Sequence, residues 1–225
     1  THHNALDADL FLRIAPELYL KRLLVGGFEK VFEIGKNFRN EGVDKSHNPE
    51  FTMLEFYFAY ADYEDLMDFA ELMLSEAAKT ITGSTDVSWG DTTLSFAAPF
   101  QRYSYIDLIE ERTGINVLEE KDPKVYLNAF AEHRITAPET HTYTKLVDEL
   151  YKEIVRPTLK NPTVLYNYPV ELVPLAKRNL ADPRIAEMFQ LVVAGMEIVK
   201  AYTELNDPVE QRNRFAEQQL NRDSG

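Results

Sequence analysis

Two neighbouring segments, residues 31–38 and 51–59, combine apolar and polar residues in a pattern typical of paired β-strands, with a polar stretch between them. Strand side chains alternate between two faces. One face of the second segment is mixed and consists of Phe51, Met53, Glu55 and Tyr57. The other face, which runs from Thr52 to Phe58, is almost wholly apolar. The acid on the mixed face is costly to bury among apolar neighbours unless a partner neutralises it, and that partner can be a ligand.

The rest of the chain divides into helical and extended segments. Apolar positions at helical spacing, bounded by residues that favour helix ends, predict helices over residues 17–25, 63–82, 105–112 and 208–220. Short apolar runs predict strands over residues 86–90, 92–96, 163–168, 189–194 and 197–203. Residues 121–160 are mostly helical in pattern, and we expect residues 100–160 to form an insertion beside the sheet. If the last hairpin turns over three residues, 194–196, Gln190 and Lys200 face each other.

Composition and charge narrow the class of protein. The 225 residues are enough to bury a sizeable core as one large domain. A net charge of −13 disfavours a general polyanion binder, so attraction to a nucleic acid would have to come mostly from elsewhere. The chain has no cysteine, which excludes disulfides and thiolate metal sites and fits a reducing cytoplasm. No apolar run approaches the roughly 18 residues of a membrane span, and we expect no membrane partner.

Two motifs carry a family resemblance. Residues 38–41 read Phe-Arg-Asn-Glu, and residues 47–55 read His-Asn-Pro-Glu-Phe-Thr-Met-Leu-Glu. This region resembles motif 2 of the class II aminoacyl-tRNA synthetases, in the form found in lysyl-tRNA synthetases. Further stretches agree with that family in the same order, at residues 1–7, 14–23, 174–179 and 202–207. The resemblance implies an α+β fold, with the antiparallel β-sheet of the class II catalytic core flanked by helices and a mostly helical insertion.

The resemblance implies that Arg39 is the catalytic residue and contacts both the lysine carboxylate and the α-phosphate of ATP. A guanidinium suits this role because its fixed fork can bond two oxyanions at once. Without the family, Arg39 is equally well explained as a turn arginine paired with Glu33 or Glu41. The family also implies ATP contacts by Phe51, which stacks on adenine, by Glu41 at the adenine end, and by His47 at the terminal phosphates. A lone loop histidine is otherwise usually just exposed to solvent.

Selectivity for lysine requires carboxylates at both ends of the substrate, because each end carries an ammonium. The resemblance implies that Glu204 and Tyr57 bind the ε-ammonium and that Glu17 binds the α-amine. It also implies that Glu55 lines the pocket and that Tyr202 forms an aromatic wall. Buried acids around one cation recover their desolvation free energy only when the cation is bound. Glu17 alone is equally explained as a helix-start carboxylate favoured by the helix dipole.

Two positions depart from the family. Relatives carry acids at the positions of Gln190 and Glu197, which hold magnesium on the ATP phosphates, so Gln190 is a doubtful metal position. Relatives carry an asparagine where this chain has Lys200, a residue implied to help hold the substrate carboxylate. The two changes are explained either by drift or by partial replacement of a metal ion by the Lys200 ammonium. The implied cofactor is Mg²⁺, at reduced occupancy under the second explanation, and ATP is a substrate.

The implied function is that of a lysine–tRNA ligase, which activates lysine with ATP and transfers it to tRNA(Lys). The implied partners are lysine, ATP, tRNA(Lys) and a second copy in a homodimer, in the cytoplasm. From the resemblance, we expect residues 1–225 to start after the family's first motif, to stop before its third and to lack its anticodon-binding domain. We therefore expect a partial catalytic domain that is inactive alone. Two alternatives are a related ligase that modifies elongation factor P and a non-catalytic, synthetase-like binding protein.

Overall fold

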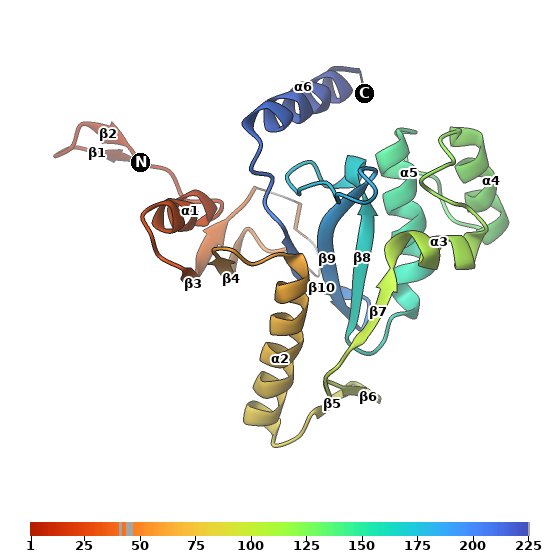
Figure 1. Cartoon of the computed structure of the whole chain (residues 1–225), viewed down its shortest axis with the longest axis horizontal. Helices are drawn as coiled ribbons and strands as arrows, with labels where there is room; N and C mark the ends of the chain where they lie inside the picture. The colour runs from red at the N-terminus through yellow and green to blue at the C-terminus, as the bar shows by residue number, and fades with distance from the viewer. Residues whose placement is uncertain (41, 44–46, 225) are drawn as a thin grey trace. The chain divides into compact units, whose positions relative to one another are not determined.

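The structure is a computed structural model that describes residues 1–40, 42–43 and 47–224, without the side chains of residues 217 and 220–224. The chain divides into two compact units, Thr1–Ala61 and Asp62–Gly225. Helices alternate with sheets that are mainly antiparallel, which confirms the predicted α+β class (Figure 1). Among the described residues, none of the helices is both long and apolar enough to cross a bilayer.

The first unit is built on a long antiparallel strand pair. Its elements are β1 (His2–His3), β2 (Ala8–Asp9), α1 (Glu17–Val25), β3 (Lys30–Phe38) and β4 (Glu50–Phe58). Strands β3 and β4 pair without interruption, from Lys30 opposite Phe58 to Phe38 opposite Glu50. Helix α1 has the predicted bounds, begins after Pro16 and packs against both strands. The strand pair and α1 therefore form one small layer of helix on sheet.

The second unit is larger. Its helices are α2 (Tyr63–Thr82), α3 (Tyr105–Thr113), α4 (Pro123–His133), α5 (Tyr143–Leu150) and α6 (Pro208–Ser224), with the short turns η1 (Tyr151–Val155), η2 (Arg156–Thr158) and η3 (Val170–Leu172). Its strands are β5 (Asp86–Trp89), β6 (Thr92–Ser95), β7 (Gln101–Ser104), β8 (Thr163–Pro169), β9 (Ile185–Val193) and β10 (Met196–Tyr202). Four strands form one sheet in the order β10-β9-β8-β7.

Strands β7 and β8 are parallel, whereas the other pairs in this sheet are antiparallel. A parallel connection requires a crossover of a dozen or more residues. The segment from α3 to η2 supplies it, and it is largely helical, as the pattern of residues 121–160 predicted. The sequence did not predict β7, because its four residues show no apolar alternation.

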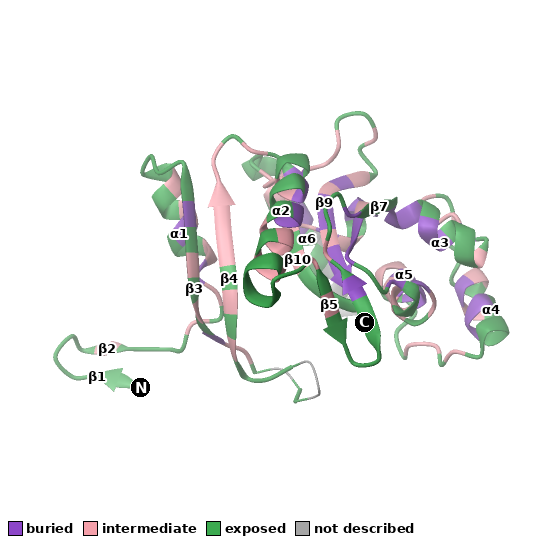
Figure 2. Ribbon diagram, turned by 90° about the horizontal axis from the view of Figure 1, so that it is seen from below, coloured by how far each residue is buried: buried purple, intermediate pink, exposed green. Residues whose placement is uncertain are grey.

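Each face of the four-stranded sheet has its own core, because successive residues of β9 point to opposite sides. On one face, α2 packs Met67 and Ala70 against Phe189 and Leu191. On the other face, α3, α4, α5 and η1 cover Met188 and Val192 with a larger cluster that includes Ile109, Tyr126, Leu146 and Leu150. The buried residues of α2, α3 and α5 are visible in Figure 2. The second unit is thus a sheet between two helical layers.

Local capping explains why the helix bounds could be predicted. The Asp62 side chain accepts hydrogen bonds from the backbone N–H groups of Glu64 and Asp65, and Asp65 returns one to Asp62, which forms a capping box at the start of α2. Gly83 ends α2 in the left-handed conformation, with φ of 82°. Strand β9 begins at Ile185, four residues before the predicted start, and ends at Val193, one residue before the predicted end.

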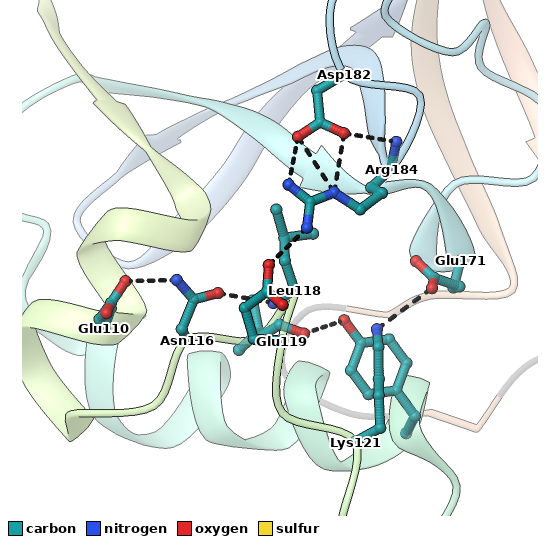
Figure 3. A network of polar contacts seen from close by, with 10 residues as sticks. Glu110, Asn116, Leu118, Glu119, Lys121, Glu171, Asp182 and Arg184 are labelled. Atoms are coloured by element: carbon teal, nitrogen blue, oxygen red, sulfur yellow. Dashed lines mark hydrogen bonds and ion pairs between the residues drawn. The ribbon is translucent and has the colours of Figure 1, made fainter.

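A polar network joins the loop after α3 to the segment between β8 and β9 (Figure 3). Asn116 donates to Glu110 at 3.0 Å, and Lys121 donates to Glu171 at 3.3 Å. Arg184 bonds both Asp182 and Glu119, with Nη1 2.6 Å from the Glu119 carboxylate. Exposed pairs of this kind add little stability one by one. Together, however, they hold the loop after α3, which is part of the crossover, against the segment that precedes β9.

Candidate functional site

The mixed face of β4 is paired with β3 in a register that gathers polar groups. Phe51 lies opposite Asn37, Glu55 opposite Glu33, and Tyr57 opposite Val31. The Tyr57 hydroxyl donates to Oε2 of Glu55 at 3.2 Å. Phe51, Glu55 and Tyr57 therefore share one half-buried face, as the alternation predicted.

Helix α1 adds a second carboxylate to this face. Glu17, in its first turn, accepts a hydrogen bond from Nζ of Lys21 at 2.6 Å. The same Nζ lies 5.6 Å from the centre of the Tyr57 ring. Glu17, Lys21, Glu55 and Tyr57 form what we call the acid–lysine cluster. It lies wholly within the first unit.

Arg39 follows the last residue of β3 and is held by its neighbours. Its Nε donates to the carbonyl oxygen of Ile14 at 3.2 Å, and its guanidinium lies 5.1 Å from the centre of the Phe51 ring. Glu33, one of the partners considered from the sequence, forms an ion pair with Arg13. The guanidinium is thus stacked on the aromatic ring that the family resemblance assigns to adenine.

Glu55 is only partly compensated by its surroundings. Burial raises the pKa of its carboxyl above the ordinary value, the Tyr57 hydrogen bond lowers it, and the charge of Glu17 raises it again. Arg39 and Lys21 lower the same pKa through their positive charges. The net shift is upward, which means that the ionised carboxylate is less stable here than in water. A bound cation would remove that penalty.

In the second unit, a cavity of about 480 Å³ lies between the β9–β10 side of the sheet and the helices α5 and η1. Gln190, Glu197 and Lys200 line it from the sheet. The other charged lining residues are Lys145, Asp148, Lys152, Arg156 and Glu171. The lining thus has four cationic side chains, counting Lys200, and three carboxylates, counting Glu197, and this small positive excess favours an anionic ligand.

The β9–β10 hairpin has a shorter turn than expected and contains a β-bulge. Met196 pairs with Val193, so the turn has two residues, 194–195, both with positive φ, and the three-residue turn was wrong. Lys200 nevertheless pairs with Gln190, as predicted, because the register shifts between Glu197 and Val199. Ile198 is the extra residue of this β-bulge.

The bulge also explains why Glu197 and Lys200 line the same cavity. In a regular strand, residues three apart point to opposite faces. The amide oxygen of Gln190 accepts a hydrogen bond from the Tyr168 hydroxyl at 2.9 Å. Glu197 is exposed as a whole residue, but the partial burial of its carboxyl raises its pKa, while Lys200 and Arg156 lower that pKa. Lys200 is thus electrostatically coupled to Glu197.

Glu204 lies just beyond β10 and is fixed through its backbone. It forms an isolated antiparallel bridge with Ala176, and the N–H of Leu205 donates to the Leu175 carbonyl at 3.2 Å. Tyr202, two residues earlier, is half-buried and packs against the larger core cluster. The segment that positions Glu204 is one of those that carried the family resemblance.

The predicted site residues fall into two groups. The structure brings Glu17, Glu55 and Tyr57 together, with Arg39 over Phe51, in the first unit. It brings Gln190, Glu197 and Lys200 together in the second, where Tyr202 and Glu204 also lie. His47 is exposed, and Glu41 lies outside the described residues.

Sequence reasoning missed several residues that complete these sites. Lys21 was overlooked, although its position four residues after Glu17 signals a contact on a helix. Tyr168 and the basic residues of the cavity, Lys152 and Arg156, carried no motif that could have identified them. Among the described residues, no group of three or more His, Cys, Asp or Glu side chains is arranged to hold a metal ion.

Comparison with known proteins gives a consistent result. Residues 1–224 match the model of a family described as tRNA synthetases class II (D, K and N). The chain is 46% identical over 225 residues to a lysine–tRNA ligase of Enterococcus faecalis, covering all of this chain and 45% of that protein. It is 50% identical over 218 residues to one of Dehalococcoides mccartyi, covering 97% of this chain and 44% of that protein. The chain thus spans less than half the length of these relatives.

Proposed function

We propose, because the chain belongs to the class II tRNA synthetases (D, K and N), that it acts in a lysine–tRNA ligase. In that reaction a lysine carboxylate oxygen attacks the α-phosphorus of ATP and pyrophosphate leaves. A ribose hydroxyl of tRNA(Lys) then attacks the lysyl carbonyl carbon, and AMP leaves. Relatives named lysine–tRNA ligase match the chain from end to end or nearly so, which supports this assignment.

The observation that carries the proposal is the acid–lysine cluster. It contains two half-buried carboxylates: Glu55 accepts a hydrogen bond from the Tyr57 hydroxyl, and Glu17 already holds an alkylammonium, that of Lys21. A site of this composition suits a substrate that carries ammonium groups. Glu17 would accept hydrogen bonds from the α-ammonium of lysine, and Tyr57 would lie near the ε-ammonium with Glu204, while Glu55 lines the pocket.

Arg39 would bind the substrate carboxylate and the α-phosphate together. Activation requires little acid–base chemistry, so the contribution of the protein is positioning and charge neutralisation. Phe51 would stack on the adenine, with Glu41 at the adenine end and His47 near the terminal phosphates. The guanidinium stacked on the Phe51 ring supports this arrangement, because both groups would then contact the same nucleotide.

The cavity of the second unit would take the anionic part of the reactants. Lys200 would help hold the substrate carboxylate, and Tyr202 would form an aromatic wall beside Glu204. Glu197 fits a magnesium ion through one carboxylate, but the neutral Gln190 already accepts a hydrogen bond from Tyr168. A bound Mg²⁺ would neutralise charge on the ATP phosphates. We infer weaker magnesium binding by this chain than two carboxylates would give.

We also propose that the two units form one catalytic domain with residues 100–160 as an insertion. The crossover position of this segment between β7 and β8 supports that interpretation. A tRNA(Lys) partner, assembly as a homodimer and a cytoplasmic location follow from the proposed function. The acidic charge of the chain implies that most attraction to tRNA comes from other parts of the full-length protein.

The decisive experiment uses the full-length protein. Exchange of labelled pyrophosphate into ATP should depend on L-lysine, and tRNA(Lys) should then accept lysine. β-Lysine serves as the control substrate, since preference for it would favour a ligase that modifies a protein. Absence of exchange with both amino acids would contradict the proposed function.

A further inference from the structure

Lys21 lies where an amino-acid ligand would place an ammonium group. Its Nζ donates to Glu17 at 2.6 Å and lies 5.6 Å from the Tyr57 ring centre. The two charged side chains are about equally accessible, with 29% of Lys21 and 32% of Glu17 exposed. Lys21 therefore joins a residue of α1 to a residue of β4, which an ordinary pair on a helix surface does not do.

The head group of Lys21 is chemically the same as the ends of a lysine molecule. An ammonium beside a carboxylate and an aromatic ring is stabilised by a charge-assisted hydrogen bond and by attraction to the ring. Glu17 has two potential partners, the Lys21 ammonium on its own helix and an ammonium of the substrate. A carboxylate that holds one ammonium closely has less capacity for a second, so these two partners compete.

We propose that Lys21 is an internal competitor for the substrate, occupying Glu17 in the empty site and releasing it to the α-ammonium of a bound amino acid. The inference rests on the proposed function, because it takes lysine as the ligand. It makes Lys21 a specificity-determining residue. A ligand without an α-ammonium cannot displace it productively.

The charges of the site support this exchange. Glu17 and Glu55 bring two negative charges to the face, and Lys21 and Arg39 bring two positive ones. Lys21 and Arg39 both favour the ionised form of Glu55, whereas Glu17 opposes it. Lys21 thus keeps the ligand-free site near neutrality. When an α-ammonium arrives, the flexible stem of Lys21 can carry its own ammonium to solvent, since the side chain is already partly exposed.

Calorimetry on the full-length protein tests the exchange with two ligands. L-Lysine carries an α-ammonium, and 6-aminohexanoate is the same molecule without it. Lys21→Met should bind L-lysine about two- to fivefold more tightly than wild type, the range for freeing a partly exposed ion pair. It should show no gain for 6-aminohexanoate. Lys21→Arg, which keeps the charge, should show no gain for either ligand.

Lys36→Met is the matched control, because Lys36 also pairs with a carboxylate of the first unit, Glu50 at 3.0 Å, on the opposite face of the strand pair. It should leave both affinities unchanged. If Lys21→Met does not fold, Lys21→Gln repeats the test with another long, uncharged helix former. Unchanged or weaker lysine binding by the folded variant, or equal gains for both ligands, would overturn the proposal. Failure of the wild type to bind lysine would instead contradict the proposed function.

Discussion

Two carboxylates of this molecule, Glu71 in the second unit and Glu55 in the first, differ in how far neighbouring protein groups compensate their charge. Glu71 is 3% exposed, and both of its oxygens are bonded. The backbone N–H of Phe100 donates to one at 3.1 Å, and Nε of Arg102 donates to the other at 2.7 Å. Glu55 is half-buried, is bonded by the Tyr57 hydroxyl, and has a raised pKa.

This difference indicates which carboxylates are candidates to bind a cationic ligand. A carboxylate whose oxygens are all bonded by protein groups, as in Glu71, fixes one element against another. A carboxylate that its own protein leaves partly uncompensated has free energy to gain from a cation. By this criterion, the Glu71–Arg102 pair is structural, and the face of Glu55 is the candidate binding surface that we propose. The four changes below, ordered by expected effect, test that distinction.

The largest effect is expected for Arg39→Lys in the full-length protein. Lysine-dependent pyrophosphate exchange should fall by about 100-fold or more, because a point charge cannot bridge two oxyanions as a guanidinium fork does. The control is Arg22→Lys, since Arg22 also lies over an aromatic ring, that of Tyr19, at 5.7 Å. Near-normal exchange by Arg39→Lys would show that charge alone is sufficient.

Arg102→Met should have the largest effect on stability. It leaves the buried Glu71 without its cation, which should lower the local free energy of opening by about 3 kcal/mol. Native-state hydrogen exchange of the β7 and α2 amides measures this quantity. Arg112→Met is the control, because Arg112 is an exposed arginine 3.7 Å from Glu111, and its loss should change the free energy by less than about 0.5 kcal/mol. Equal effects would contradict the assignment of Glu71 as structural.

An intermediate effect is expected across the β9–β10 pair. Gln190→Glu and Lys200→Asn, made singly, should each lower pyrophosphate exchange by several-fold. The double variant should retain more activity than either one, because the two residues face each other and share a cavity. Simple addition of the two losses would show that the changes arose by drift and do not compensate each other.

The smallest effect is expected for Glu55→Gln on stability. A carboxyl whose pKa is raised in the folded state contributes stability below its unfolded pKa and loses it as pH rises through the folded value. Between about pH 4 and pH 7, the wild type should therefore lose thermal stability relative to Glu55→Gln. Thermal melts across this range measure the difference. A constant gap between the two proteins would indicate that the Glu55 carboxyl is not perturbed.

The helices could be predicted from the sequence because their ends are set by local chemistry. Pro16, Asp62 and Gly83 define the ends of α1 and α2 without help from distant residues. Strand β7 could not be predicted, since only pairing with β8 makes it a strand. The two-residue turn and the bulge at Ile198 could not be predicted from the sequence for the same reason. Register depends on which side chains the sheet buries on each face.

The site could be predicted only where a motif carried it. Arg39, Phe51, Glu55 and Tyr57 lie in the motif that resembles the family, and the pairing of β3 with β4 followed from simple alternation. Lys21 was missed because an acid and a lysine four residues apart on a helix usually form a surface pair. Its contact with the Tyr57 ring depends on the packing of α1 on β4, which local sequence does not encode.

The bulge in β10 has a consequence for insertions and deletions. Glu197 lies opposite Val192 and Val199 lies opposite Leu191, so Ile198 has no opposing residue of its own. A deletion at Ile198 would leave every other cross-strand pair of β10 with its present partner. A deletion further along the strand would exchange the faces of the residues on one side of it. The bulge at Ile198 is therefore a place in β10 where the strand can lose a residue while Lys200 and Tyr202 keep their present face.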